Sequence, residues 1–192
     1  MARRGKYTAD MTYPLLTPRL SIEPLKLFDL DAFVSYRQDA DIARFQSWDT
    51  TYSAEQAVEL IESQAGVLLP KQGQWLQLAV HEQISGELVG DLALHSLIEN
   101  QSVFEIGFTI ASQHQGKGFA REAASRLMIF LFSEVGAQKI VANTDRRNVS
   151  SIRLLLDLGF IFHPEKSWTE NFKNEIATVD CFECLTQSVT NS

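Results

Sequence analysis

The chain has 192 residues, a net charge of −7 and 45% apolar residues, which suits one globular domain with a substantial core. The negative charge argues against bulk attraction to nucleic acid or to an anionic membrane, and we expect neither as a partner. No run of about 18 apolar residues occurs, so no membrane span is predicted. The basic N-terminal segment lacks a following apolar stretch, which argues against a secretory signal and favours a cytoplasmic location.

Residues 1–14 are predicted to form a flexible tail, followed by a single domain over residues 15–188. Alternating apolar and polar residues from Leu20 to Leu25 predict a first strand. Residues 26–38 have helical spacing, with four apolar side chains on one stripe: Leu27, Leu30, Phe33 and Val34.

A second helix is predicted over residues 52–64, because Ser53 and Gln56 fit a capping box in which each side chain caps the backbone of the other. Two strands follow, over residues 75–82 and 86–97. A short turn between them favours an antiparallel hairpin.

The next strand, residues 102–111, has an apolar face and a second face that carries Glu105, Gly107 and Thr109. A bend containing two glycines leads directly into a strong amphipathic helix that ends at Gly136.

The rest of the chain predicts a strand at residues 138–144, a helix at 148–159, and strands at 160–165 and 175–185. Three successive strands before a βαβ unit imply a mixed sheet that is antiparallel in its first part. The fold class is therefore α+β and not a doubly wound repeat.

The cysteines Cys181 and Cys184 lie in a predicted strand, where a spacing of three places them on opposite faces. There is no second cysteine pair, so two free thiols are expected instead of a zinc site. Four histidines show no ligand spacing, and no metal site is predicted: His81, His95, His114 and His163.

The bend before the long helix contains Gly116 and Gly118. Backbone N–H groups at a helix N-terminus have no partner within the helix, and together with the helix dipole they favour an anion such as a phosphate. Glycine lets the backbone approach such a ligand closely. Lys117 and Arg121 add positive charge nearby.

Three other interpretations of this bend compete. A Walker A loop needs a hydroxyl residue after the lysine, but Gly118 follows Lys117. A dinucleotide fingerprint needs a third glycine where Arg121 stands, and the expected βαβ repeat is missing. A plain glycine turn without a ligand is the third alternative.

A second motif downstream favours a different interpretation of the bend. Gln115, Gly118 and Ala120 match Q/R-x-x-G-x-G/A, and residues 148–160 match N-x-x-S-x-x-L-L-x-x-x-G-F. In this order, the two motifs resemble the coenzyme A loop and the following helix of GNAT acetyltransferases. The segments "LLTPRLSIEPL" and "EIGFTIA" resemble the ribosomal-protein N-acetyltransferase (RimJ/RimL-like) branch, and the resemblance covers roughly residues 15–187.

The resemblance implies a mostly antiparallel sheet of about seven strands that splays apart between residues 102–111 and 138–144. Acetyl-CoA would lie in the splay as co-substrate, with its pantetheine arm along the backbone of Phe108 and Ile110. Its pyrophosphate would meet the N–H groups of the bend: Gln115, Gly116, Lys117, Gly118, Phe119 and Ala120. Asn148 would contact coenzyme A, cap the second helix, or do both.

The implied reaction is direct attack of an amine on the thioester. Glu105 matches a strand glutamate that serves as the base in several GNAT enzymes; alternatively it faces solvent or only orients the substrate. Ser151 matches a serine proposed as the acid for the leaving thiolate; alternatively it only supports the helix start.

Other residues near these motifs have plainer interpretations. Arg146 and Arg147 could meet the 3′-phosphate, although a solvated pair is the simpler reading. Trp48 and Trp168 are expected in loops, where packing at a loop edge or a wall of the acceptor cleft is possible.

The leading functional hypothesis is an acetyl-CoA-dependent N-acetyltransferase acting on the N-terminal α-amine of a protein, such as a ribosomal protein. A polyamine or aminoglycoside is the alternative acceptor, and a non-catalytic acyl-CoA-binding module is the alternative from another class. An acidic cleft with few aromatic walls would favour a polyamine, and a broad open groove would favour a peptide. Monomer and homodimer both stay open.

Overall fold

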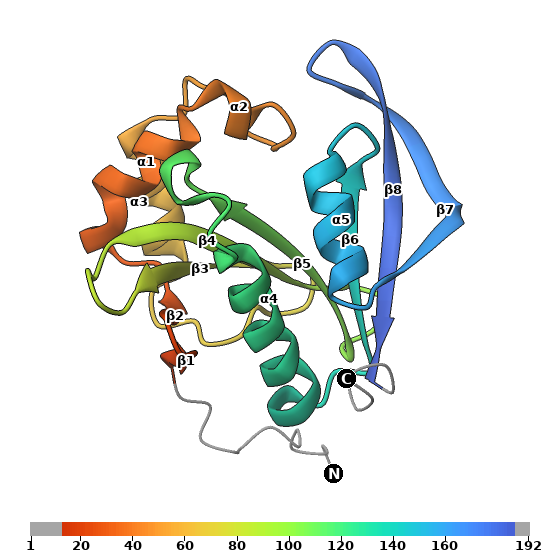
Figure 1. The fold of residues 1–192 in the computed structure, drawn as a ribbon, viewed down its shortest axis with the longest axis horizontal. Coiled ribbons are helices and arrows are strands. Elements are labelled where there is room, and N and C mark those ends of the chain that lie inside the picture. Colours follow the sequence, from red (N-terminus) through yellow and green to blue (C-terminus); the bar gives the residue numbers. More distant parts are fainter. Residues whose placement is uncertain (1–12, 187–192) are drawn as a thin grey trace.

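The computed structural model describes residues 13–186, so residues 1–12 of the expected tail lie outside the described part. One sheet has the strand order β1-β2-β3-β4-β5-β6-β8-β7 (Figure 1). Its strands are β1 (Leu15–Leu16), β2 (Leu20–Pro24), β3 (Trp75–Glu82), β4 (Leu88–Ser96), β5 (Val103–Ile110), β6 (Lys139–Asp145), β7 (Ile161–Phe172) and β8 (Glu175–Leu185). All neighbours are antiparallel except β5 and β6, which confirms the predicted mixed fold.

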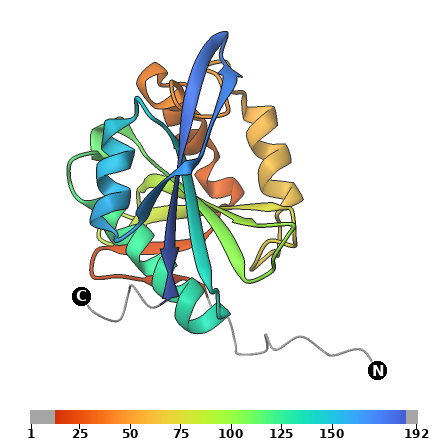
Figure 2. The same cartoon turned by 90° about the vertical axis from the view of Figure 1, so that its right-hand side faces the viewer.

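Helices cover both faces of the sheet (Figure 2). They are η1 (Leu27–Asp29), α1 (Leu30–Arg37), α2 (Ala40–Ala43), α3 (Ala54–Ser63), η2 (Ser112–His114), α4 (Phe119–Ile129), its π-helical continuation η3 (Phe130–Val135), and α5 (Val149–Asp157). Side chains of α4 and α5 join the larger core, exemplified by Leu127 and Leu155. Phe33 of α1 and Ala57 of α3 form a second core on the other face. No helix in residues 13–186 is long and apolar enough to cross a bilayer.

Local signals account for several helix boundaries. The predicted capping box is confirmed, since the Gln56 backbone N–H donates to Ser53 Oγ at 3.3 Å and the Ser53 N–H donates to Gln56 Oε1 at 2.8 Å. Gly136, in the left-handed region at φ 79°, ends the helical segment after η3 as expected.

The last hairpin differs from the prediction. Strand β7 runs from Ile161 to Phe172 instead of ending at residue 165, so Trp168 lies in a strand and not in a loop. The register of β7 against β8 shifts between His163 and Trp168, and such an irregularity breaks the alternation on which the prediction relied.

Near the two ends of the described chain, Tyr13 and the two cysteines pack against other parts of the fold. The ring of Tyr13, a residue of the predicted tail, packs against the ring of Phe130 with centroids 5.8 Å apart. Cys181 and Cys184 are buried free thiols on opposite faces: Cys181 packs in a small cluster with Val141, and Cys184 joins the main core.

Strands β5 and β6 pair only where both begin. The last paired residues are Glu105 and Val141, and the two strands diverge beyond that level (Figure 1). From Ile106 onward, the edge of β5 that faces β6 therefore has no strand partner. This is the expected splay, and it positions the site described next.

Candidate active site

Two hollows meet beside the splay. A cavity of about 310 Å³, here called the splay cavity, lies between β5, β6, α5 and the β7–β8 hairpin. A larger hollow of about 920 Å³, here called the wide cleft, lies between α1, α3, the loop joining α2 to α3, and the sheet. Both are lined by Glu105, Gly107, Phe108 and Asn143, so β5 and β6 form their common boundary.

Cross-strand register arranges the sheet surface under the wide cleft. The first row across β3, β4 and β5 contains Trp75, His95 and Glu105. The next row contains Gln77, Ala93 and Gly107, and the third contains Ala79, Asp91 and Thr109. Two of the three residues in the middle row, Ala93 and Gly107, are small and leave open space between the outer rows.

Glu105 is held from two sides. Asn143 Nδ2 donates a hydrogen bond of 2.9 Å to Glu105 Oε1, and His95 Nδ1 lies 3.4 Å from Oε2. The His95 ring stacks on Trp75 with centroids 4.5 Å apart and planes inclined by 10°. Neither His95 nor Asn143 belongs to a sequence motif of the site; the register of β4 against β5, which places His95 opposite Glu105, is the signal that could have revealed His95.

A buried ion pair lies deeper in the wide cleft. The Arg37 guanidinium is 4.0 Å from Asp91 Oδ2, and both residues are buried. The hydroxyl of Tyr36 and the amide of Gln77 donate to the Asp91 carboxylate. Burial raises the pKa of Asp91 above its usual value, and Arg37 opposes this shift.

Three aromatic rings enclose the Arg37 guanidinium: Phe33, Trp48 and Tyr52, at 4.1, 3.7 and 4.9 Å from their centroids. Trp48 also donates from Nε1 to the Arg37 carbonyl at 3.1 Å. Trp48 therefore lines the cleft and packs at a loop edge at the same time.

The bend before α4 has the geometry of an anion site. Gly116 and Gly118 have φ of 73° and 80°, and Gly118 is the N-cap of α4. Within residues 13–186, no backbone N–H from Gly116 to Ala120 has a hydrogen-bond acceptor. A Cβ on Gly116 would meet nothing within 4 Å, and one on Gly118 would meet only Arg19 at 3.5 Å. The glycines thus leave room for a phosphate.

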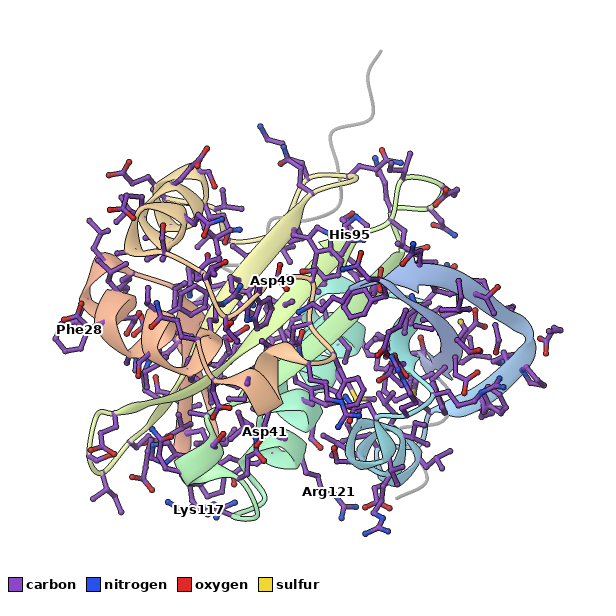
Figure 3. The ribbon with its side chains drawn as sticks, turned by 90° about the horizontal axis from the view of Figure 1, so that it is seen from above. Phe28, Asp41, Asp49, His95, Lys117 and Arg121 are labelled. Carbon is purple, nitrogen blue, oxygen red and sulfur yellow. The ribbon has the colours of Figure 1, made fainter. Side chains whose placement is uncertain are left out.

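Neighbouring side chains hold this bend in place. Arg19 Nη1 donates to the Lys117 carbonyl at 2.9 Å, while the same guanidinium pairs with Glu122 at 2.6 Å. Lys117 and Arg121 lie along the same side of the molecule in the view of Figure 3, whereas His95 and Asp49 lie nearer its middle.

The structure brings together some of the residues that the sequence singled out. Glu105, Phe108, Asn148 and Ser151 all line the splay cavity. Asn148 caps α5, because its Oδ1 accepts from the Ser151 N–H at 3.2 Å and from the Ser150 hydroxyl at 2.9 Å.

Other predicted residues lie apart from that cavity. Ile110 is buried, and its carbonyl accepts a 3.0 Å hydrogen bond from Gln115 Nε2. The Phe119 side chain is also buried, so this residue presents only its backbone to the bend. Arg146 pairs with Asp180 and Arg147 with Asp145, so both arginines of the 145–148 turn are engaged in ion pairs.

Lys173 connects the β7–β8 hairpin to α2 and to the loop between α2 and α3. Lys173, at the turn of the β7–β8 hairpin, donates to the carbonyls of Ala43 at 2.8 Å and Trp48 at 2.5 Å. It also lies 3.1 Å from Asp49. In Figure 1 the tip of this hairpin stands opposite α2.

Comparison with known proteins gives one consistent result. The family model described as "Acetyltransferase (GNAT) domain" matches residues 19–161. The Bacillus subtilis protein YoaA, named as an uncharacterized N-acetyltransferase, is 30% identical over 149 residues, which cover 77% of this chain and 83% of YoaA.

Solved structures agree on the fold. A GNAT-family acetyltransferase from Bacillus anthracis has a TM-score of 0.78 at 20% identity, covering 90% of this chain and 98% of that one. Spermidine N-acetyltransferase from Vibrio cholerae, solved with CoA and spermine, has a TM-score of 0.77 at 20% identity and covers 91% and 100%. At this identity, the likeness extends to the fold alone.

Proposed function

The chain belongs to the GNAT family and is an N-acetyltransferase; from that premise we propose that it transfers the acetyl group of acetyl-CoA to the N-terminal α-amine of a protein or peptide. A ribosomal protein is the first acceptor to test. The position of Glu105 carries the proposal, because this residue lines both the splay cavity and the wide cleft. A base at that boundary can meet an amine from one side and a thioester from the other.

Acetyl-CoA, the acyl donor of this family, supplies an activated acetyl thioester when bound. The free N–H groups of the bend from Gly116 to Ala120 support a place for its diphosphate. The unpaired edge of β5 beyond Glu105 supports a place for the pantetheine arm, since its exposed backbone groups need partners.

Glu105 is proposed to remove the proton that the amine must lose, directly or through a water. An α-amine has a pKa of about 7.7–8.0, so much of it is protonated at neutral pH. Asn143 holds one carboxylate oxygen and leaves the other near His95. Ser151 is proposed to assist the leaving thiolate, although a thiol pKa of about 8.5 makes this help modest.

A polyamine acceptor is the second candidate, favoured by four acidic residues around the wide cleft: Asp49, Glu59, Asp91 and Glu105. Two of these are already engaged, because Asp49 pairs with Lys173 and Asp91 accepts from Tyr36 and Gln77. The aromatic walls and the volume of about 920 Å³ favour a peptide.

A thiol-release assay tests the proposal. The protein is given acetyl-CoA with unblocked peptides, the same peptides with blocked N-termini, polyamines and aminoglycosides. Thiol release with unblocked peptides alone is the expected result. If the protein binds acetyl-CoA yet releases no thiol with any amine, the proposal fails and a non-catalytic binding role replaces it.

A further inference from the structure

Two buried polar atoms in the wide cleft lack hydrogen-bond partners. Within residues 13–186, three buried side-chain atoms are unsatisfied: Arg37 Nε, Arg126 Nη1 and Asn143 Oδ1. Arg37 and Asn143 both line the wide cleft. Leaving a buried donor or acceptor unpaired costs about 1–3 kcal/mol, so such atoms in a cleft indicate groups that a ligand can satisfy.

Asn143 presents an acceptor. Asn143 contacts Glu105 Oε1 through its amide nitrogen, which donates a hydrogen bond of 2.9 Å. The amide oxygen then remains without a donor. An N–H group of an incoming amine beside Glu105 would satisfy it.

Arg37 presents donors. It is 5% exposed, and its guanidinium is enclosed by the rings of Phe33, Trp48 and Tyr52. Its nearest carboxylate, Asp91, lies 4.0 Å away, which is beyond hydrogen-bond range. A buried guanidinium whose Nε–H has no acceptor favours a carbonyl or carboxylate oxygen as its partner.

The two sites are separated along the sheet. Glu105 and Thr109 are four residues apart on β5, and Thr109 is level with Asp91 beside Arg37. Four residues of strand span about 13 Å. An extended peptide advances about 3.3–3.6 Å per residue, so its third or fourth residue would reach Arg37 when its N-terminus is at Glu105.

We propose that the wide cleft binds the first three or four residues of a peptide, with the α-amine at Asn143 and a backbone carbonyl at Arg37. This inference rests on the proposed function and specifies how the acceptor is recognised. Spermidine fits less well, because all its polar groups are N–H donors or cations and none can accept from Arg37. The Asp91 carboxylate is a poor partner for a second ammonium group of spermidine, because it already accepts hydrogen bonds from Tyr36 and Gln77.

Calorimetric titration of the protein loaded with CoA tests this without requiring turnover. The ligands are alanine amide, the di-, tri- and tetra-alanine amides, and spermidine. Affinity should rise about 10- to 100-fold between the dipeptide and the tetrapeptide, the value of one hydrogen bond to a charged group. Spermidine should bind more weakly than the tetrapeptide.

The double variant R37M/D91N removes the ion pair without leaving an unpaired buried charge. It should abolish the length dependence, while R153M, at an exposed arginine of α5, should retain it. Tighter binding of spermidine, no dependence on length in the wild type, or an unchanged length dependence in R37M/D91N would each overturn the inference. Wild-type titrations decide the matter even if the double variant does not fold. Absence of thiol release would instead count against the proposed function alone.

Discussion

Asn143 Nδ2 and Glu105 Oε1 form a 2.9 Å hydrogen bond between β5 and β6 at the point where the pairing of these two strands ends. Glu105 is the last residue of β5 that pairs with β6, and its partner there is Val141. Asn143 lies two residues beyond Val141 on β6. The side chains thus maintain a link where the backbones separate. This link fixes the Glu105 carboxylate at the boundary between the splay cavity and the wide cleft.

If Glu105 is the base, its replacement should matter most where the amine is protonated. We expect Glu105→Gln to lower kcat about 10²- to 10⁴-fold at pH 7, with much of the loss recovered near pH 9.5, where free amine is abundant. Initial rates of thiol release from pH 6.5 to 9.5 measure this. Glu62→Gln, at an exposed position of α3, is the control. A loss that is uniform across this range would indicate an orienting role instead.

Two glycines in the left-handed region, Gly118 in the bend and Gly86 between β3 and β4, allow a matched comparison. Gly118 and Gly86 have φ of 80° and 72°, so an alanine at either position incurs a similar backbone cost of about 1–2 kcal/mol. Only Gly118 lies at the start of α4. We expect Gly118→Ala to weaken CoA binding at least about tenfold and Gly86→Ala to leave it unchanged, as measured by calorimetry at 15 °C. Equal affinities in the two variants would contradict the placement of the diphosphate.

Lys173 should hold the α2–α3 loop over the cleft. Lys173→Met removes its hydrogen bonds to the carbonyls of Ala43 and Trp48 and its pairing with Asp49. We expect faster amide hydrogen exchange in residues 44–51 and little change in α3. Lys71→Met, at an exposed residue before β3, serves as the control. Unaltered exchange in the loop would show that other contacts hold it.

The Asp180–Arg146 pair should affect stability in acid. Hydrogen bonds from Arg146 hold the pKa of Asp180 below its usual value, against the effect of burial. A lowered folded-state pKa stabilises the protein above the unfolded pKa of about 3.9, and this contribution is lost as pH falls through the folded value. Asp180→Asn should therefore lower the melting temperature at pH 7, and its difference from the wild type should shrink below pH 4. Asp157→Asn, at an exposed position of α5, serves as the control variant.

Much of the fold was predictable because its signals are local. The capping box at Ser53, the alternation on β5 and the glycine bend before α4 each depend on residues within a few positions of one another. The order of the resulting elements, read with handedness and layer rules, was sufficient for the mixed sheet, whereas the splay was expected only from the resemblance to GNAT acetyltransferases. The same local signals placed Glu105 on the polar face of its strand.

The contacts between side chains of the site were decided by the tertiary structure. Arg37 and Asp91 are 54 positions apart in the sequence, and their meeting depends on how α1 packs over β4. The Asn143 contact depends on where β5 and β6 part, and the strand position of Trp168 on a register shift against β8. Local sequence determines periodicity and chain reversal, whereas cross-strand register and helix packing are set by burial of the whole core, which no short segment encodes.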